Sequence, residues 1–380
     1  MKIPVSEPPI GEIEIEYVLD AVKSGWVSGS KGPYIEKFEN EFSSYCNSKF
    51  GISCSSGTSA LQLAVSVLDL QPNDEVIVPT FTNISTILAV VHSGAKPVLI
   101  DSDPEIWGMD HTKISEKITE KTKAIIPVHI YGHPVEMDTI MKISDEHKLV
   151  VIEDAAEAHG AEYKGKRIGG IGHMGCFSFY ANKIITTGEG GMIVTNNESF
   201  AKKTMSLRNL AFQNSTKYLH EYLGYNFRMS NILAALGCAQ FLKIDEFISK
   251  KRDMAKMYYL GLSKIPGICL PVEKSWAKNV YWMYGIVLKK EFGMTRDELR
   301  DFLSKRGIET RTFFVPMHKQ PGLIHRGFFN NDKDYPIAEE LSENGLYIPS
   351  GLTITKEGIS YVIECIKEAF EVGNQKNNYH

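Results

Sequence analysis

The chain has 380 residues, of which 43% are hydrophobic and 23% are charged, and its formal net charge at pH 7 is −4. This length predicts one large domain with a substantial apolar core and one smaller domain. So small a net charge excludes a strong electric field toward nucleic acid or an anionic membrane. No apolar run reaches the length of a membrane span. We therefore expect a cytoplasmic protein that works without nucleic acid or membrane partners.

The first half of the chain alternates between apolar runs of strand length and segments with helical spacing. Helices are predicted over 13–22, 60–68 and 84–91 and around Ile140. The predicted strands are Phe50–Ser53, Glu75–Pro79, Pro97–Asp101, Ala124–Ile130, Leu149–Asp154, Cys176–Tyr180 and Met192–Thr195. Strands that form nearly continuous apolar runs between helices indicate an α/β fold with a mostly parallel sheet between layers of helices.

The chain after residue 230 is predicted to be helical at first and then mixed. Apolar residues at helical spacing predict helices at Ile232–Phe247 and Met254–Leu262, which would link two domains. A strand at Tyr281–Val287 and a helix at Arg296–Lys305 follow. We therefore predict a large domain over 1–250, including the N-terminal segment, and a smaller C-terminal α+β domain over 251–380.

Ser56-Gly57-Thr58 lies where a predicted strand turns into a predicted helix. Free backbone N–H groups, the helix dipole and small hydroxyl groups at such a turn suit a phosphate, and glycine lets the backbone come close to it. The alternative is an ordinary helix N-cap, which this short motif alone favours.

Asp154 ends a predicted buried strand, and ligands of parallel sheets gather beyond the carboxyl ends of the strands. A carboxylate at that place can pair with the protonated ring nitrogen of a pyridine cofactor, or it can simply cap the next helix. Glu157, in the turn that follows, would either reach a phenolic oxygen of the same ligand or face solvent.

Lys183 stands between two predicted buried strands, before the polar segment Thr186–Gly191. Burial disfavours the charged form of a lysine, and the uncharged amine can attack a carbonyl carbon to form a Schiff base. A lysine beside glycine turns is more often a solvated surface residue, so this segment alone favours the surface interpretation.

Other patterns in the chain do not indicate a metal or a nicotinamide cofactor. His129 and His133 have a spacing typical of metal sites on helices, but a predicted strand end and Gly132 lie between them. The six cysteines are too sparse for a disulfide framework and wrongly spaced for zinc. The turn Gly188–Gly191 does not follow the strand–turn–helix plan of a dinucleotide fingerprint. No metal ion is therefore predicted.

The phosphate turn, the strand-end aspartate and the lysine between strands follow the chain order of fold-type I enzymes that depend on pyridoxal 5′-phosphate (PLP). Over nearly its whole length the chain resembles the nucleotide-sugar aminotransferases of this class, and within them it is most similar to the GDP-perosamine synthases. The segments that carry the resemblance are Ser56–Leu61, Glu75–Thr80, Val128–His133, Val151–Gly160, Phe177–Asn196, Gly224–Met229 and Pro316–His318.

The resemblance implies roles for individual residues around PLP. Lys183 would bind the cofactor covalently and act as the catalytic group. Asp154 would pair with the pyridine nitrogen, and Glu157 would lie near the ring hydroxyl. The cofactor's phosphate would be bound by Gly57, Thr58 and Ser178.

The resemblance also implies contacts with substrate and with a second subunit. Asn226 would reach the phosphate of the neighbouring subunit's PLP, which implies a homodimer with shared active sites. His318 would lie near the substrate sugar. Arg228 and Arg311 are candidates for binding the co-substrate carboxylate or the sugar diphosphate, with surface salt bridges as the alternative.

One position departs from the family pattern. Where these enzymes usually place an aromatic residue stacked on the PLP ring, this chain has Asn83. Either Phe81 takes the aromatic's place through a shifted turn, or a polar amide covers the ring.

The function that the resemblance implies is an aminotransferase that uses PLP and its amino form, pyridoxamine phosphate (PMP). It would move an amino group from L-glutamate to the C4 ketone of a nucleotide-linked 4-keto-6-deoxy sugar. GDP-4-keto-6-deoxymannose giving GDP-perosamine is favoured, with O-antigen and lipopolysaccharide biosynthesis as the pathway. A dTDP or UDP ketosugar and amination at C3 remain open.

Two further alternatives are a PLP-dependent sugar dehydratase and a non-catalytic relative that binds a nucleotide sugar. In the dehydratase branch of the family, histidine typically replaces the lysine, so the presence of Lys183 argues against a dehydratase. The intact set of Lys183, Asp154 and Ser178 argues against a non-catalytic protein.

Overall fold

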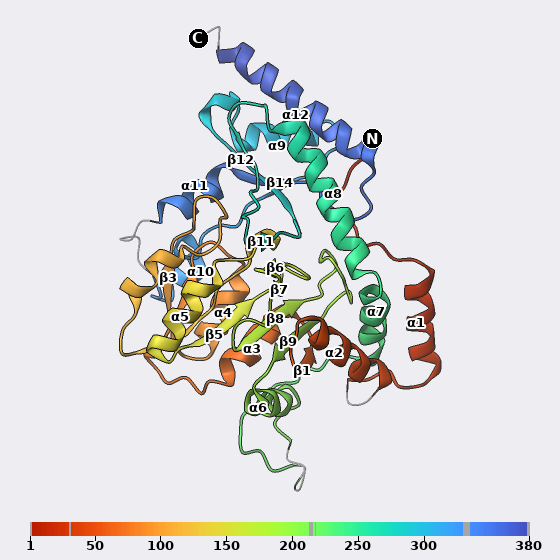
Figure 1. Ribbon diagram of the computed structural model, residues 1–380, viewed down its shortest axis with the longest axis vertical. Coiled ribbons are helices and arrows are strands. Elements are labelled where there is room, and N and C mark those ends of the chain that lie inside the picture. The colour runs from red at the N-terminus through yellow and green to blue at the C-terminus, as the bar shows by residue number, and fades with distance from the viewer. Residues whose placement is uncertain (1, 30–31, 213–215, 217, 330–334, 378–380) are drawn as a thin grey trace.

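The computed structural model describes residues 2–29, 32–212, 216, 218–329 and 335–377 of the chain. Figure 1 shows two parts, each with its own sheet, and the long helix α8 (Ile244–Leu262) that runs from one part into the other. The lower part in this view contains a seven-stranded sheet, and the upper part contains a four-stranded sheet.

After two N-terminal helices, strands and helices alternate from residue 50 to residue 154, as the sequence predicts, and the strands up to residue 195, a stretch that the structure describes throughout, then follow one another without a helix between them. The other α-helices of the described residues are α1 (Glu12–Lys23), α2 (Pro33–Tyr45), α3 (Gly57–Ser66), α4 (Ile84–His92), α5 (Met137–His147), α6 (Glu198–Arg208), α7 (Asn231–Phe241), α9 (Arg296–Ser304), α10 (Pro321–Ile324), α11 (Pro336–Asn344) and α12 (Lys356–Asn377). The strands are β1 (Phe50–Cys54), β2 (Glu75–Pro79), β3 (Lys96–Ile100), β4 (Thr122–Ile125), β5 (Val150–Asp154), β6 (Glu162–Tyr163), β7 (Lys166–Arg167), β8 (Met174–Ser178), β9 (Gly191–Thr195), β10 (Ile268–Cys269), β11 (Ala277–Lys278), β12 (Tyr284–Leu288), β13 (Arg311–Thr312) and β14 (Gly345–Ile348). Short 3₁₀ helices are η1 (His111–Lys113), η2 (Ser115–Lys117), η3 (Ile130–Gly132), η4 (Lys290–Phe292) and η5 (Met317–Lys319).

The seven-stranded sheet has the order β1-β9-β8-β5-β4-β2-β3. Its neighbouring strands are parallel except around β9, which is antiparallel to both β1 and β8. Every residue of β8 and β9 is buried, which explains why these strands are continuous apolar runs in the sequence. The prediction of a mostly parallel sheet is confirmed, and the carboxyl ends of β1, β2, β5 and β8 meet at one edge.

The predicted strand Ala124–Ile130 is too long, because β4 ends at Ile125. Pro127 has no N–H group to donate to a sheet ladder. Beyond it the chain makes only an isolated bridge from Val128 to Asp154 and then enters η3. This early end places the residues around Tyr131 beyond the sheet, above the end of β5.

The predicted helix Ile232–Phe247 is interrupted. Helix α7 ends at Phe241, and α8 begins at Ile244 after Lys243, whose backbone (φ −111°, ψ 9°) is not helical. The Lys243 ammonium forms an ion pair with Glu14 of α1 across this break. Helix α7 packs on α1 and α2, while α8 leads into the upper part (Figure 1).

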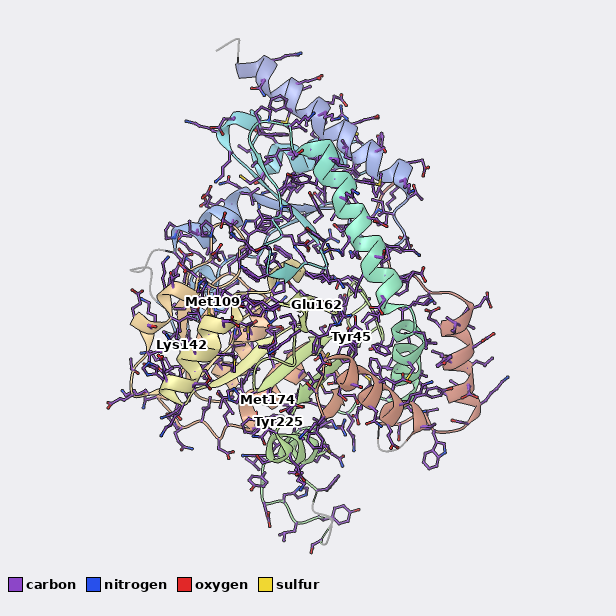
Figure 2. The ribbon with its side chains drawn as sticks, viewed as in Figure 1. Tyr45, Met109, Lys142, Glu162, Met174 and Tyr225 are labelled. Carbon is purple, nitrogen blue, oxygen red and sulfur yellow. The ribbon has the colours of Figure 1, made fainter. Side chains whose placement is uncertain are left out.

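The apolar core is divided between the two parts of the molecule. Figure 2 shows side chains filling the space around the larger sheet, where Met174 is fully buried, whereas Lys142 on α5 is exposed. A second cluster begins at Met254 within α8 and includes Ile3 from the start of the chain, which forms a bridge with Ile308. The N-terminal residues thus lie with the upper part, and the boundary at 250/251 stays a prediction. No helix in the described ranges is long and apolar enough to cross a bilayer.

Candidate active site

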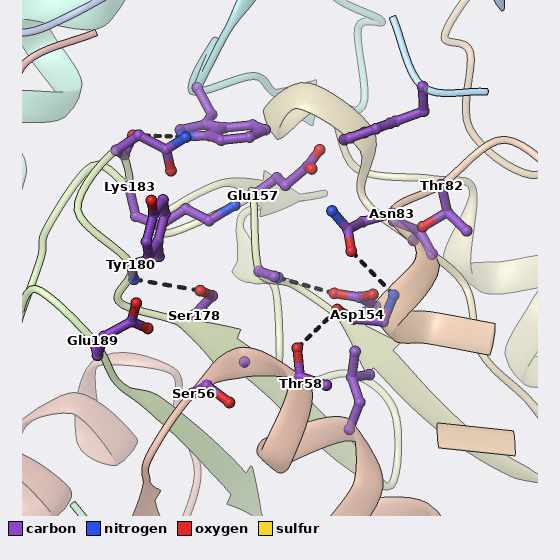
Figure 3. Close-up of a pocket in the computed structure, with 18 of the residues that line it drawn as sticks. Ser56, Thr58, Thr82, Asn83, Asp154, Glu157, Ser178, Tyr180, Lys183 and Glu189 are labelled. Carbon is purple, nitrogen blue, oxygen red and sulfur yellow. Dashed lines mark hydrogen bonds between the residues drawn. The ribbon is translucent and has the colours of Figure 1, made fainter. Parts of the chain in front are cut away.

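A cavity of about 310 Å³ lies at the edge where the carboxyl ends of β1, β2, β5 and β8 meet. Figure 3 shows side chains from these four strand ends pointing into the same space. The predicted residues that line it are Gly57, Thr58, Asp154, Glu157, Ser178 and Lys183. The fold therefore brings together the six residues predicted to hold a cofactor within this subunit.

The turn at Ser56 serves both as a helix N-cap and as a wall of the cavity. The Ser56 hydroxyl accepts a hydrogen bond of 3.1 Å from the Ser59 N–H at the start of α3. A Cβ atom on Gly57 would lie 2.6 Å from the Ser178 Cβ, so only glycine fits between this turn and β8. The remaining N–H groups of the first helical turn, with the Thr58 and Ser178 hydroxyls beside them, form a cradle for an anion.

Asp154 is buried at the end of β5, with only 4% of its surface exposed. The Thr86 hydroxyl donates a hydrogen bond of 2.8 Å to Oδ2, and the Ala156 N–H donates one of 3.2 Å to Oδ1. Burial raises the pKa of this carboxyl group, while these hydrogen bonds and the charge of Lys183 oppose the rise. A cation placed in the cavity would stabilise the ionised form further.

Lys183 follows β8 on a turn closed by a hydrogen bond of 2.9 Å from its own N–H to the Tyr180 carbonyl. Figure 3 shows its side chain extending across the cavity toward Glu157. Burial lowers the pKa of the Lys183 amine, and the charges of Glu157 and Asp154 oppose that shift. The surface alternative is wrong, because the amine lies within the cavity.

Glu157 is also buried and points into the cavity, so the solvent-facing alternative is wrong. Its Oε2 accepts a hydrogen bond of 2.7 Å from the Tyr131 N–H. Tyr131 has a left-handed backbone (φ +52°), which turns this N–H toward the carboxylate. Burial raises the pKa of Glu157 to about 7; the Lys183 charge opposes the rise and the Asp154 charge adds to it.

Asn83, not Phe81, lines the cavity. Asn83 is the N-cap of α4, and its Oδ1 accepts a hydrogen bond of 3.0 Å from the Ser85 N–H. Phe81 is buried against Tyr131 and Phe313, at ring distances of 6.2 and 5.8 Å. Of the two alternatives for the missing aromatic residue, the structure favours the polar amide.

His318 lies outside this cavity, although the resemblance implies that it contacts the substrate sugar. It is buried, with its Nδ1 2.7 Å from the Thr80 hydroxyl and its Nε2 3.0 Å from Glu339 Oε1. These contacts join the turn after β2 to α11. Within one subunit, both nitrogens of the His318 ring therefore contact other side chains of the protein.

The other three residues implied by the resemblance also lie outside the cavity. Asn226 is exposed and forms a bridge with Asn209. Arg228 donates a hydrogen bond of 2.8 Å from Nη1 to the Asn209 side chain. Arg311 is exposed in β13, opposite Tyr347, which does line the cavity.

Sequence reasoning missed several residues that complete the wall. Tyr180 and Glu189 come from either side of Lys183, whereas Trp282, Phe314 and Tyr347 come from segments far along the chain. The first two lie inside the segment that drew attention to Lys183. The last three carry no motif of their own, so only the packing of the two parts brings them to the site.

The two histidines set aside as a metal site make separate contacts. The His129 Nε2 lies 3.1 Å from Glu153 Oε2, and the His133 Nδ1 donates a hydrogen bond of 2.6 Å to the Pro134 carbonyl. Within the ranges that the structure describes, no three histidine, cysteine, aspartate or glutamate side chains form a group that could hold a metal ion.

The donor set of the cavity fits PLP. Close packing of Gly57 against Ser178 presents backbone N–H groups to a phosphate, Asp154 offers a buried carboxylate to a protonated ring nitrogen, and the Lys183 amine is held within the same space. A phosphate, a basic ring nitrogen and an aldehyde are the groups of PLP that need such partners.

Comparisons with known proteins agree with this chemistry. The model of the DegT/DnrJ/EryC1/StrS aminotransferase family matches residues 8–367. GDP-perosamine synthase of Escherichia coli O157:H7 is 40% identical over 368 residues, which cover 97% of this chain and 98% of that protein. The dTDP-3-amino-3,4,6-trideoxy-alpha-D-glucose transaminase of Streptomyces venezuelae is 36% identical over 339 residues, which cover 89% of this chain and 87% of that protein.

The fold is that of solved members of the same class. Spr1654 of Streptococcus pneumoniae, solved in its PLP form, matches with a TM-score of 0.91 and 28% identity over 98% of this chain and 100% of that one. The cofactor of the present chain is therefore PLP. Since the family model spans nearly the whole sequence, the chain belongs to the DegT/DnrJ/EryC1/StrS aminotransferase family and is a PLP-dependent nucleotide-sugar aminotransferase.

Proposed function

We propose that the protein transfers the amino group of L-glutamate to the C4 ketone of GDP-4-keto-6-deoxymannose and so forms GDP-perosamine. The observation that carries this proposal is the 40% identity to GDP-perosamine synthase over 97% of the chain. The cavity supports the aminotransferase chemistry, because one subunit gathers an amine, a strand-end carboxylate and an anion cradle around a single space. O-antigen or another surface polysaccharide is the pathway that such a product would feed.

We assign the cofactor contacts to seven residues of the cavity. Asp154 pairs with the ring nitrogen, Glu157 lies beside the ring hydroxyl, and the Asn83 amide covers the ring. Lys183 binds the cofactor covalently between reactions. The residues that hold the phosphate are Gly57, Thr58 and Ser178.

The chain's own groups then handle the proton. PLP, when bound, supplies the electron sink that makes the Cα–H bond of an amino acid acidic. The Lys183 amine takes that proton as general base and returns it as general acid. Burial lowers the pKa of this amine, so the uncharged form needed to accept a proton is more accessible than for a surface lysine. Asp154 stays ionised beside the cationic ring nitrogen, because opposite charges favour each other in a buried site.

The substrate contacts and the assembly are proposals as well. Arg311 lies next to the cavity wall through Tyr347 and is a candidate for the donor carboxylate or the sugar diphosphate. Asn226, Arg228 and His318 are outside the cavity of their own subunit, and Asn226 is exposed. We propose that the protein is a cytoplasmic homodimer in which Asn226 completes the cavity of the partner copy. Light scattering of the purified protein would test whether it is a dimer. In that dimer Arg228 and His318 remain candidates for substrate contacts.

The test is a comparison of ketosugars with the PLP-loaded enzyme and ¹⁵N-labelled L-glutamate. GDP-4-keto-6-deoxymannose, dTDP-4-keto-6-deoxyglucose and a UDP-4-keto-6-deoxy sugar are offered separately, and products are identified by mass spectrometry and by NMR at C3 and C4. Labelled amine at C4 of the GDP sugar alone is expected. Conversion of the dTDP or UDP sugar alone would overturn the assigned substrate, and no conversion of any ketosugar would contradict the proposed reaction.

The second candidate is a dTDP-linked ketosugar, which the 36% identity to a dTDP-aminosugar transaminase favours. The same experiment decides between the two, because both substrates are tested against one donor. Amination at C3 needs a dTDP sugar whose ketone is at C3, so labelled amine at C3 of such a sugar would indicate this second class of reaction.

A further inference from the structure

Trp282 is attached to the turn that carries Lys183. Its side chain is 4% exposed and lines the cavity just before β12. The indole Nε1–H donates a hydrogen bond of 2.8 Å to the carbonyl of Asn182, the residue that precedes Lys183. This hydrogen bond joins the Trp282 ring to the backbone of the turn that carries Lys183. The backbone of Trp282 itself lies in the segment that leads into β12.

The Lys183 amine lies over the face of this ring. Its Nζ is 3.6 Å from the centre of the Trp282 ring. The face of an indole attracts a cation within about 6 Å, and tryptophan attracts it most strongly of the aromatic side chains. The Trp282 ring is buried, so solvent does not cover the side of the amine that faces it.

Trp282 is held from two further sides, so the ring cannot easily swing away from the amine. It stacks on Tyr131 with ring centres 6.3 Å apart and planes 28° from parallel. The buried Lys251 ammonium donates a hydrogen bond of 2.7 Å to the Trp282 carbonyl. The indole N–H, the ring face and the backbone carbonyl of Trp282 are thus each held by a separate contact.

The charged groups around the amine make this placement useful. The carboxylates of Asp154 and Glu157 both attract the Lys183 ammonium, and burial keeps the pKa of His159 at about 3, so that imidazole is uncharged at neutral pH. An amine paired tightly with either carboxylate would take that group away from the cofactor. The ring of Trp282 offers the amine a position that occupies neither carboxylate.

We propose that Trp282 is a positioning residue for Lys183, whose amine rests on the indole face when it is neither covalently bound nor transferring a proton. This inference rests on the proposed catalytic role of Lys183. It assigns the ring two effects: it keeps the free amine inside the cavity, and it stabilises the protonated amine against burial. The ring takes no part in bond making or breaking.

The test measures the pKa of the Lys183 amine in the PMP-loaded enzyme, in which the lysine is not covalently bound. Competitive labelling with acetic anhydride across a pH series, followed by mass spectrometry of the Lys183 peptide, reports this pKa without any turnover. Trp282→Phe keeps a ring with a weaker negative face, so it is expected to lower this pKa by part of the half a unit to one and a half units, roughly, that a whole cation–ring contact contributes, and Trp282→Leu by all of it. The matched control is Trp107→Phe, because Trp107 packs 6.4 Å from the same Tyr131 ring but does not line the cavity.

A second measurement covers the case in which Trp282→Phe does not fold. Fluorinated tryptophans incorporated into the wild-type chain keep the shape and the Nε1–H but progressively weaken the negative face of the ring. The pKa of Lys183 should then fall stepwise with the number of fluorine atoms. An unchanged pKa in the fluorinated series would overturn the proposal, and so would an unchanged pKa in a folded Trp282→Phe variant. The measurement uses no ketosugar, so its result can be interpreted whether or not the protein converts the proposed substrate.

Discussion

The hydroxyl of Thr86, in α4, donates a hydrogen bond of 2.8 Å to Oδ2 of Asp154, and both side chains are buried. The Thr82 hydroxyl lies 2.9 Å from the same Thr86 oxygen, so a short chain of hydroxyl groups leads to the carboxylate. A hydrogen bond to the ionised form of an acid favours that form, and burial acts against it. Thr86 therefore helps to keep Asp154 ionised in a site that would otherwise favour the neutral acid.

Thr86→Val should raise the pKa of Asp154 and destabilise the enzyme, because valine keeps the shape of threonine but cannot donate to the carboxylate. A hydrogen bond to a charged group contributes about 1.5–3 kcal/mol, so we expect a loss of about 2 kcal/mol in the free energy of unfolding at neutral pH and weaker PLP binding. Urea unfolding and PLP titration measure these two effects. Thr204→Val is the control, because the buried Thr204 hydroxyl has no hydrogen-bond partner among the described residues. Equal losses in the two variants would contradict this account.

Gly57→Ala should weaken PLP binding more than it weakens the fold. The new Cβ would lie 2.6 Å from the Ser178 Cβ, and the turn must move away from β8 to admit it. Overpacking of this kind costs about 1–3 kcal/mol, and the movement would disturb the N–H groups that we propose hold the phosphate. The measurement is the dissociation constant of PLP beside the midpoint of urea unfolding. Gly322→Ala, where a Cβ meets open space, should leave both unchanged; unaltered PLP affinity in Gly57→Ala would rule out the phosphate cradle.

Lys183→Ala should abolish turnover of the ketosugar while leaving the protein folded. Loss of a general acid–base group alone slows a reaction by about 10²–10⁴-fold, and we propose that this lysine also forms the bond to the cofactor. Steady-state kinetics with the preferred ketosugar give the rate, and circular dichroism checks the fold. Lys142→Ala is the control on the exposed face of α5 and should keep the full rate. Turnover by Lys183→Ala at the wild-type rate would remove the assignment of the catalytic lysine.

Lys251 should make the enzyme more stable as the pH rises from about 7 toward 10.5. Its ammonium is buried in α8 and is hydrogen-bonded to the carbonyls of Trp282 and Ser350, and burial lowers its pKa from 10.5 to about 7. Between these values the unfolded chain holds a proton that the folded chain has lost, so the free energy of unfolding increases with pH. Below pH 7 both states are protonated and the penalty of burying the charge is constant.

Lys251→Met should remove this pH dependence, because methionine carries no proton. The stability of the wild type relative to the variant should rise by about 1.4 kcal/mol for each pH unit within the window. Urea unfolding at several pH values measures the slope. The neighbouring Lys250 is exposed and paired with Glu246, so Lys250→Met should unfold in parallel with the wild type. A flat difference between the wild type and Lys251→Met would show that Lys251 does not titrate in this range.

The strands and the reactive side chains at their ends could be predicted because the sequence patterns that indicate them involve only residues close together in the chain. Glu75–Pro79 is predicted and observed with the same bounds, since a buried parallel strand is a nearly continuous apolar run, here from Val76 to Pro79. Asp154 and Lys183 could be predicted because Asp154 ends such a strand and Lys183 follows another, and parallel strands bring their carboxyl ends to one edge. Pro127 shows the limit of this reasoning, because one missing N–H group ended β4 earlier than its apolar run.

The sequence by itself therefore determined the class of fold, and it predicted the residues that would hold the cofactor and their order along the chain. Only the tertiary structure decided which other side chains complete the cavity. It brought Trp282 and Tyr347 to Lys183, buried Phe81 instead of Asn83, and enclosed His318 between Thr80 and Glu339. The physical reason is that strand patterns and helix caps depend on neighbouring residues, whereas a cavity wall depends on how distant segments pack against one another.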